Sequence, residues 1–528
     1  MVAVAAAYVV AFAAMQLPSL FDPHWLEWDA RANTMPAWRY HATGLFPNDF
    51  LVDFHGVMCT IGWRIVYWVG TLFTDPNQLS KLLPFVGLGV VVWQGWAFGR
   101  DRGGRAIGAA TVILLVHCNY LWDRMLGANA RAFGFPLVVM WIRYAAGGLE
   151  RRALGTLFLQ AICYPSVFVF CAPAHALTLQ RRRGPMLRFA LVAAVSSVVV
   201  LLAVRSVDPR IGHSVTYAEL EKMGPQRELS ALYPLQKAEV SVAHALKTSL
   251  YATYGSYIVF VQPWAERWAG VLMGVLLAGL SLLAGRRLST LPRVFPALLL
   301  TSLVAFTAAQ CVPYRLYFPD RMLLFSWPPL FLMALPLVAH EGLKRFTQHA
   351  AVAAAALVVT VQLVVCGSGL LPKLDLWDWS AGDTETVKFV AKLPKNVTVA
   401  AHFNTASAVQ TFAHRQVLFS AISNIPHHYP FALELERRIG AYYRAYYARD
   451  LTPVRAMVAT FGIDYLIVDT RDFGPDAKKR AQYLEPWTSL ANSLIQRGPL
   501  DGCVFASPPA QAVVFRDGPT VIVDLHKL

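Results

Sequence analysis

Long apolar segments separated by short polar connections dominate residues 1–372 of the chain. A helix needs about 20 mostly apolar residues to cross the hydrocarbon core of a bilayer. Segments near this length predict about eleven transmembrane helices. We place them near residues 1–20, 79–99, 106–122, 132–148, 153–166, 167–180, 188–204, 267–285, 293–311, 322–340 and 348–367. The pattern therefore predicts a polytopic α-helical membrane protein.

Basic residues predict the orientation of these helices. Clusters of Arg and Lys lie in alternate connections, at residues 100–105, 143–152, 181–188, 286–293 and 344–345. Such residues are enriched in cytoplasmic connections, so all five clusters fall on the cytoplasmic side if the N-terminus is cytoplasmic.

Two apolar stretches do not fit a simple crossing. Inserting residues 56–73 would reverse the side of every later basic connection, so we expect an amphipathic helix in the outer interface there. The pair of segments around Tyr164 and Pro165 is too short for two full crossings, which predicts a broken or partly re-entrant pair.

The pattern changes at about residue 373, where short strand-like runs begin to alternate with helical ones. The strand-like runs are 397–401, 417–420, 465–469, 504–506, 513–515 and 521–523, and the helical runs are 384–392, 430–447, 453–461 and 476–497. This alternation predicts a soluble α/β domain over residues 373–528 with a partly parallel sheet. It would lie on the extracytoplasmic side, after the last predicted span.

Composition supports a membrane protein over a nucleic-acid binder. The chain has 528 residues, of which 56% are hydrophobic and only 15% charged, whereas soluble chains carry about 25%. The formal net charge of +15 resides in short clusters between apolar segments, as expected for membrane topology, so we expect no nucleic-acid partner.

The first outer connection, residues 21–78, carries acids that are candidates for proton transfer. Asp22 directly follows the first predicted span, and Glu27 and Asp29 follow within a few residues. A carboxylate that is partly desolvated at the membrane edge can act as a general base, because desolvation raises its pKa toward neutral pH. The alternative is that these acids are ordinary solvated loop residues.

Two further outer connections combine acids with arginines. Asp123 ends the third predicted span, and Arg131 follows in the run GANARAFGFP. The connection YRLYFPDRM contributes further candidates: Arg315, Tyr317, Asp320 and Arg321. Arginine forks suit phosphate oxygens. An Asp123–Arg131 ion pair and arginines that only anchor helix ends remain the structural alternatives.

Neither a cofactor nor a metal site is predicted by a specific motif. His24, His41 and His55 lack a zinc-ligand spacing. The clustered acids leave a bound magnesium or manganese ion open as an alternative.

This arrangement resembles the GT-C superfamily of membrane glycosyltransferases, which includes protein O-mannosyltransferases and lipid A aminoarabinose transferases. The shared features are an acidic first outer loop with interfacial helices, an acid at the outer end of the third span, a late arginine-rich connection and a C-terminal outer domain. The first loop lacks the adjacent Asp-Glu pair of the better-known pattern.

The resemblance implies transfer of a sugar from a polyprenyl-phosphate or diphosphate donor to an unidentified acceptor, at the outer face of the bacterial cytoplasmic membrane. Asp22 would be the general base, with Asp29 as the competing choice, and Asp123 would match the second acidic position. Arg131, Arg315 and Arg321 would bind the donor phosphate.

Two other functions fit a polytopic chain: a lipid or solute transporter such as a flippase, and a non-catalytic membrane assembly protein. Few charges and no evident internal repeat in the spans argue against a transporter. Release of polyprenyl phosphate from a labelled donor would distinguish a transferase from a transporter, and deletion of the chain after about Leu374 would separate the role of a scaffold domain.

Overall fold

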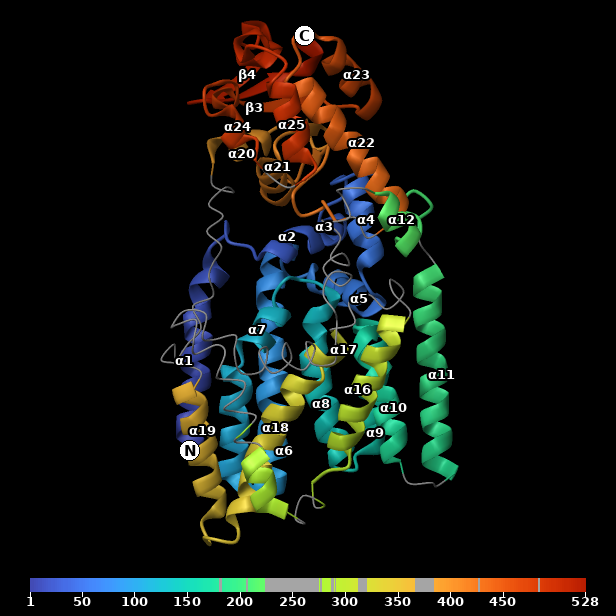
Figure 1. The fold of residues 1–528 in the computed structure, drawn as a ribbon, viewed down its shortest axis with the longest axis vertical. Coiled ribbons are helices and arrows are strands. Elements are labelled where there is room, and N and C mark those ends of the chain that lie inside the picture. The colour runs from blue at the N-terminus through green and yellow to red at the C-terminus, as the bar shows by residue number, and fades with distance from the viewer. Residues whose placement is uncertain are drawn as a thin grey trace.

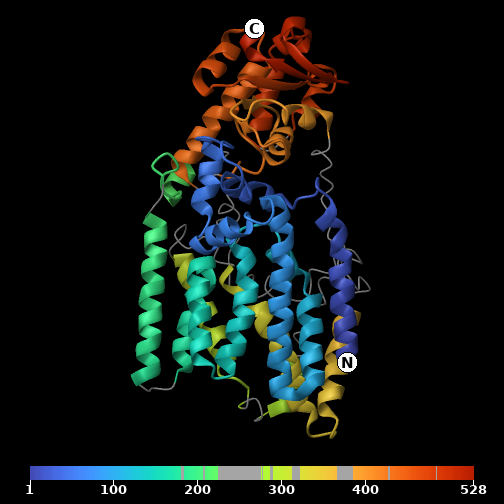
Figure 2. The same ribbon diagram turned by 180° about the vertical axis from the view of Figure 1, so that it is seen from behind.

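The computed structural model describes residues 1–179, 183–205, 208–223, 275, 278–285, 289, 291–311, 321–365, 384–425, 428–482 and 485–528. Its architecture is an elongated helical bundle with a smaller domain stacked on one end (Figure 1). Short helices of the first connection lie between the two parts, and the N-terminus lies toward the far end of the bundle (Figure 2). The predicted combination of an α-helical bundle with a C-terminal sheet is therefore observed.

The bundle consists of helices that follow the predicted apolar segments. Its members are α1 (Val2–Phe21), α6 (Pro76–His117), α7 (Asn119–Met125), α8 (Gly134–Ala146), α9 (Glu150–Cys163), α10 (Pro165–Thr178), α11 (Arg183–Arg205), α16 (Val294–Cys311), α17 (Arg321–Leu324), α18 (Trp327–Leu343) and α19 (Ala350–Val365). Four described helical segments are long and apolar enough to cross a membrane: Val2–Phe21, Pro76–His117, Arg183–Leu202 and Arg321–Leu343. Three shorter apolar helices accompany them. The number of crossings stays a prediction, because most of the expected span 267–285 lies outside the described residues.

Helix α6 is a hairpin of two helical arms. Gly104 has φ 84° and ψ −177°, a conformation that glycine adopts without steric cost. Beyond it the chain doubles back, so that a Cβ on Gly99 would lie 2.8 Å from Cα of Gly108 in the other arm. Small residues permit such close helix contact in membranes. The two arms coincide with the separate spans predicted at 79–99 and 106–122.

The pair of short helices predicted around Tyr164 is also observed. Helices α9 and α10 have 14 residues each and meet at Tyr164, where Pro165 begins the second helix. At about 1.5 Å per residue, each is about 21 Å long and shorter than a bilayer core.

The first outer connection folds into α2 (Trp28–Asn33), α3 (Met35–His41), α4 (Phe50–Met58) and α5 (Ile61–Gly70). Helix α5 is too short to span a bilayer. Trp63 and Tyr67 are buried on its inner face with ring centroids 4.2 Å apart, whereas Trp68 is exposed on the other. This amphipathic arrangement agrees with the interfacial helix that the sequence predicts in this region.

The C-terminal part contains a five-stranded sheet with the order β2-β1-β3-β5-β4. Its elements are α20 (Glu385–Val390), β1 (Thr398–Ala400), α21 (Phe403–Ala408), β2 (Gln416–Val417), α22 (Tyr429–Tyr446), α23 (Thr452–Phe461), β3 (Tyr465–Asp469), α24 (Ala477–Arg480), α25 (Trp487–Ile495), β4 (Val513–Asp517) and β5 (Thr520–Asp524). Strand β1 pairs in parallel with β2 and β3, whereas β5 pairs antiparallel with β3 and β4. The prediction of a partly parallel sheet is confirmed.

Two local predictions in this part are wrong. Val504–Ala506 forms a 3-10 turn instead of a strand, because Pro508 and Pro509 follow after a single residue and lack the N–H groups that a sheet needs. The single helix expected at 476–497 is two helices, α24 and α25. Pro486 lies immediately before α25, where a continuous helix would need its missing N–H group.

The C-terminal domain shares apolar contacts with the first connection. The ring of Phe54 on α4 stacks on Phe431 of α22 with centroids 3.8 Å apart, and Phe50 lies 5.0 Å from the same ring. The His55 Nε2 and the Ser423 Oγ form a hydrogen bond of 3.0 Å. We call Phe50, Phe54 and Phe431 the loop–domain core. It holds the domain against the acid-bearing connection.

Candidate functional site

Four of the predicted site residues are electrostatically linked on the side of the bundle that carries the C-terminal domain. Glu27 and Asp29 come from the start of α2, Asp123 from α7, and Arg131 from the short 3-10 helix Ala130–Phe133 that precedes α8. We call them the carboxylate–arginine cluster. Residues about 100 positions apart in sequence are thus joined in one site.

The helix start explains where the two first-loop acids lie. Glu27 is the N-cap of α2, and its Oε2 accepts a hydrogen bond of 3.0 Å from the N–H of Ala30. Asp29 lies in the first turn, where a negative charge is favoured by the helix dipole. The two carboxyl groups are therefore held close together at one helix end.

Asp29 and Arg131 form the ion pair at the centre of the cluster. The Arg131 guanidinium contacts Oδ2 of Asp29, and the Nδ2 of Asn129 lies 3.5 Å from the same oxygen. The Arg131 side chain is only 14% exposed and that of Asp29 is 36% exposed, so the carboxylate is the partner that solvent or a ligand reaches.

Gly127 permits this close approach. Its φ of 88° favours glycine, and a Cβ there would lie 3.1 Å from both Oε2 of Glu27 and Cβ of Asp29, and 3.3 Å from the Arg131 guanidinium. The Nδ2 of Asn33 donates to the backbone oxygens of Asp29 and Gly127 at 2.7 and 3.2 Å. These bonds fix α2 against the connection between α7 and α8.

The cluster perturbs the protonation of its own members. Burial, followed by the negative charge of Asp29, raises the pKa of Glu27 to about 8. Burial acts to lower the pKa of Arg131, but the carboxylates of Asp29, Glu27 and Asp123 raise it above its ordinary value. Glu27 is consequently protonated at neutral pH, while Asp29 faces a permanent cation.

Asp22, the first choice for the base, lies apart from the cluster's hydrogen bonds. It is exposed, and its carboxylate accepts a hydrogen bond of 2.8 Å from the N–H of His24 in its own turn. Its backbone oxygen accepts a bond of 2.5 Å from Lys81. The geometry therefore favours Asp29 over Asp22 as the buttressed carboxylate.

The Asp123–Arg131 ion pair considered as an alternative is wrong. The carboxylate of Asp123 lies 3.4 Å from Nε of Arg124, and Arg131 pairs with Asp29. Asp123 acts on the cluster through its charge, which contributes to the shifted pKa values of Glu27 and Arg131.

The late arginine-rich connection is described only at its end. Arg315, Tyr317 and Asp320 lie outside the described residues. Arg321 begins α17, and one turn later the ring of Phe325 lies 5.1 Å from that of Tyr164. Tyr164 in turn contributes to the field at Arg131, so α17 approaches the surroundings of the cluster.

Sequence reasoning missed Asn33, Gly127, Asn129 and Tyr164. The run GANARAFGFP carries the signal for two of them, since glycine and asparagine between a helix end and an arginine are typical of a tight connection. The Tyr164 hydroxyl is buried without a hydrogen-bond partner among the described residues, which no sequence pattern indicates. Within the same residues, no group of His, Cys, Asp or Glu is arranged to hold a metal ion.

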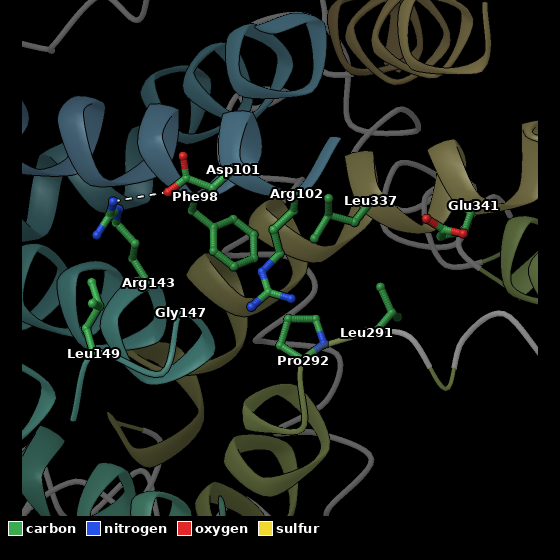
Figure 3. Close-up of a pocket in the computed structure, with 10 residues that line it drawn as sticks. All are labelled: Phe98, Asp101, Arg102, Arg143, Gly147, Leu149, Leu291, Pro292, Leu337 and Glu341. Carbon is green, nitrogen blue, oxygen red and sulfur yellow. Dashed lines mark hydrogen bonds and ion pairs between the residues drawn. The ribbon is translucent and has the colours of Figure 1, made fainter. Parts of the chain in front are cut away.

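A separate cavity of about 590 Å³ lies at the opposite end of the bundle. Figure 3 shows Asp101 and Arg102 of α6, Arg143 of α8 and Glu341 of α18 around it, with an ion pair of 3.1 Å between Arg143 and Asp101. Residues of three of the predicted basic connections, 100–105, 143–152 and 286–293, line it. This cavity does not include any residue of the carboxylate–arginine cluster.

The fold is similar to that of a solved oligosaccharyltransferase. A crystal structure of the Archaeoglobus fulgidus oligosaccharyltransferase in complex with Zn and sulfate matches with a TM-score of 0.50 and 12% identity, over 92% of this chain and 70% of that one. AglB of the same organism, with an inhibitory peptide and a dolichol-phosphate, gives 0.46 and 12%, over 92% and 72%. ArnT from Cupriavidus metallidurans gives 0.39 and 14%, over 99% and 98%.

No family model and no curated protein sequence matches the chain. The structural likeness, at this identity, establishes the fold alone. It agrees with the fold that the sequence resemblance implies.

Proposed function

We propose that the protein is a membrane glycosyltransferase that moves a sugar from a polyprenyl-phosphate or diphosphate donor to an acceptor on the side of the C-terminal domain. The observation that carries the proposal is the ion pair between Asp29 and Arg131, which joins a partly exposed carboxylate to a largely buried cation within a GT-C-like fold. Such a pair supplies a negative carboxylate that can accept a proton and a positive guanidinium that can stabilise a phosphate.

Asp29 is proposed as the general base in place of Asp22. It would accept the proton of an acceptor hydroxyl as that oxygen forms a bond to the anomeric carbon of the sugar. The bond from this carbon to the donor phosphate breaks, and the electron pair leaves on the phosphate oxygen. A single displacement of this kind inverts the anomeric configuration.

Arg131 is proposed to stabilise the leaving phosphate. When Asp29 takes up a proton, the positive charge of Arg131 loses its counter-charge and becomes available to the developing anion. The Nε of Arg131 also has no hydrogen-bond partner among the described residues. Arg321 and Arg315 are proposed to bind the same phosphate from the late connection.

An apolar groove beside the cluster suits the hydrocarbon of a lipid-linked substrate. It is lined by Leu83, Val86 and Val90 of α6 and by Pro136 and Met140 of α8, and Asn129 lies at its border. Val86 is 63% exposed on the bundle surface, so the groove opens where lipid would surround the helices. Asn129 also contacts Asp29 and thus connects the groove to the proposed base.

The test uses the full-length protein in lipid vesicles with undecaprenyl phosphate carrying a tritiated sugar, supplied in turn as mannose, glucose and 4-amino-4-deoxyarabinose. We expect release of undecaprenyl phosphate by the wild type, loss of release in Asp29→Asn, and retained release in Asp22→Asn. Loss in Asp22→Asn with full activity in Asp29→Asn would assign the base to Asp22. Movement of the labelled lipid between leaflets without release of phosphate would identify a transporter instead.

A further inference from the structure

A second cavity lies between the first connection and the C-terminal domain, and we call it the outer cleft. Its volume is about 310 Å³, within the range of small-ligand sites. Both parts of the chain line it, with His24, Trp38 and Gln78 from the first connection and α6, and Phe412 and His414 from the domain. Lys81 lines both this cleft and a narrow cavity that Glu27 of the carboxylate–arginine cluster also lines.

Aromatic rings form the walls of the outer cleft. The Trp38 indole and the His414 imidazole lie with centroids 3.9 Å apart, and the Phe412 ring lies 6.3 Å from that of His24. Each of these four side chains is partly exposed. Aromatic faces of this kind pack favourably against the C–H faces of sugar rings, while polar neighbours bind the hydroxyl groups.

Two amides of α6 provide the polar neighbours. Oδ1 of Asn77 accepts hydrogen bonds of 3.2 Å from Trp38 Nε1 and 3.0 Å from Thr34 Oγ1, which fix the orientation of the amide. Its Nδ2 is left as a donor, with no partner among the described residues. Gln78 adds both a donor and an acceptor one residue later.

His414 has the features of a ligand-binding residue. Its backbone is left-handed, with φ 53°, and its Nδ1 is buried without a hydrogen-bond partner in the described part of the chain. The neighbouring Arg415 maintains this conformation through hydrogen bonds of 2.8 and 2.6 Å to the backbone oxygens of Ala413 and Ala391. Backbone strain retained next to an unsatisfied polar atom is typical of binding sites.

The charge of the outer cleft is balanced. Lys81 and Lys388 line it together with Asp75, and Lys388 forms an ion pair of 3.0 Å with Glu385. The lining thus holds two cations and one anion, and Glu385, outside the lining, offsets the charge of Lys388, so little net charge is left to select an ionic ligand. Hydroxyl groups match its mixture of donors and acceptors better than a charged or purely apolar ligand does.

We infer that the outer cleft binds an uncharged oligosaccharide, namely the acceptor glycan of the transfer reaction. This inference rests on the proposed function for the role of the glycan, but binding itself needs neither donor nor turnover. The acceptor would then reach Asp29 from the side of the C-terminal domain, along Lys81.

Saturation-transfer NMR on the full-length protein in nanodiscs tests this inference, with maltotetraose, mannotetraose and tetra-N-acetylchitotetraose as separate probes at millimolar concentration and no donor present. We expect saturation of the C–H protons of at least one oligosaccharide. The signal should fall several-fold in Gln78→Ala and Phe412→Leu, and stay unchanged in the matched controls Gln511→Ala and Phe473→Leu, which lie elsewhere in the domain.

Asp29→Asn should bind the same oligosaccharide as the wild type, which separates binding from the proposed chemistry. No saturation of any probe by folded wild type would overturn the inference. The same holds for a signal that Gln78→Ala and Phe412→Leu leave intact, and for saturation of a random-sequence peptide alone, which would assign the cleft to a peptide.

Discussion

The substitution Gly127→Ala tests the geometry of the carboxylate–arginine cluster with little change in chemistry. A methyl group at this position would lie 3.1 Å from Glu27 Oε2 and from Asp29 Cβ, tighter than ordinary contact, and 3.3 Å from the Arg131 guanidinium. Left-handed backbone costs an L-residue about 1–2 kcal/mol, and crowding in a packed site adds about 1–3 kcal/mol. We expect the protein to relieve this crowding by moving Asp29 away from Arg131.

Gly44 offers a matched control, because its φ is 84° but a Cβ there meets no atom within 4 Å. Gly44→Ala should therefore lower thermal stability through backbone strain alone. Gly127→Ala should lower it further, and should also reduce the turnover of the lipid-linked donor by about 10- to 100-fold, since misplacement of a reacting group by about 1 Å costs about 100-fold.

The assay compares initial rates of phosphate release in vesicles with melting temperatures from intrinsic fluorescence for both variants. Equal rates in Gly127→Ala and Gly44→Ala, at comparable folded fractions, would refute a catalytic role for the geometry around Gly127. A rate lost in Gly44→Ala alone would be equally incompatible with the reasoning.

Three further substitutions probe the site and its support. Burial raises the pKa of Glu27 from 4.5 to about 8. Between these two pH values the folded protein keeps a proton that the unfolded chain releases. The free energy of unfolding should therefore fall by up to about 1.4 kcal/mol per pH unit between pH 4.5 and 8. Melting curves of Glu27→Gln should lack this decline, and a slope identical to wild type would contradict the assignment. Arg131→Lys replaces a planar guanidinium group with a compact ammonium charge. It should cut turnover, measured as phosphate release, at least about 10-fold while expression persists. Unchanged turnover would show that Arg131 does not belong to the site. Phe54→Ala should destabilise the loop–domain core by about 3–5 kcal/mol and expose the C-terminal domain to protease, whereas Leu433→Ala, at a side chain that is 44% exposed, should not.

Much of the bundle could be predicted from the sequence because apolar length and basic connections report directly on the bilayer. The position of the break at Tyr164 follows from Pro165. By contrast, the α6 hairpin joins two expected spans through Gly104, and the closeness of its arms depends on contacts between Gly99 and Gly108 that only the folded chain reveals.

The sequence predicts which residues form the site, but not which acid pairs with Arg131. Glu27, Asp29, Asp123 and Arg131 were all candidates, because acids and arginines near span ends are costly unless used. Which acid meets Arg131 depends on how α2 docks on the connection between α7 and α8, an event that joins residues about 100 positions apart. No local pattern encodes that docking, so the sequence alone favours Asp22, which directly follows the first span, over Asp29 as the base.

The loop–domain core makes the folding of the first connection depend on the C-terminal domain. Phe50 and Phe54 precede the C-terminal domain by more than 300 positions, yet their rings are covered by Phe431 of α22. A truncated chain that lacked α22 would expose both rings to water and loosen α4, which belongs to the same connection as the proposed base. The C-terminal domain would thus act as a scaffold for the proposed site, whose assembly would have to await synthesis of α22.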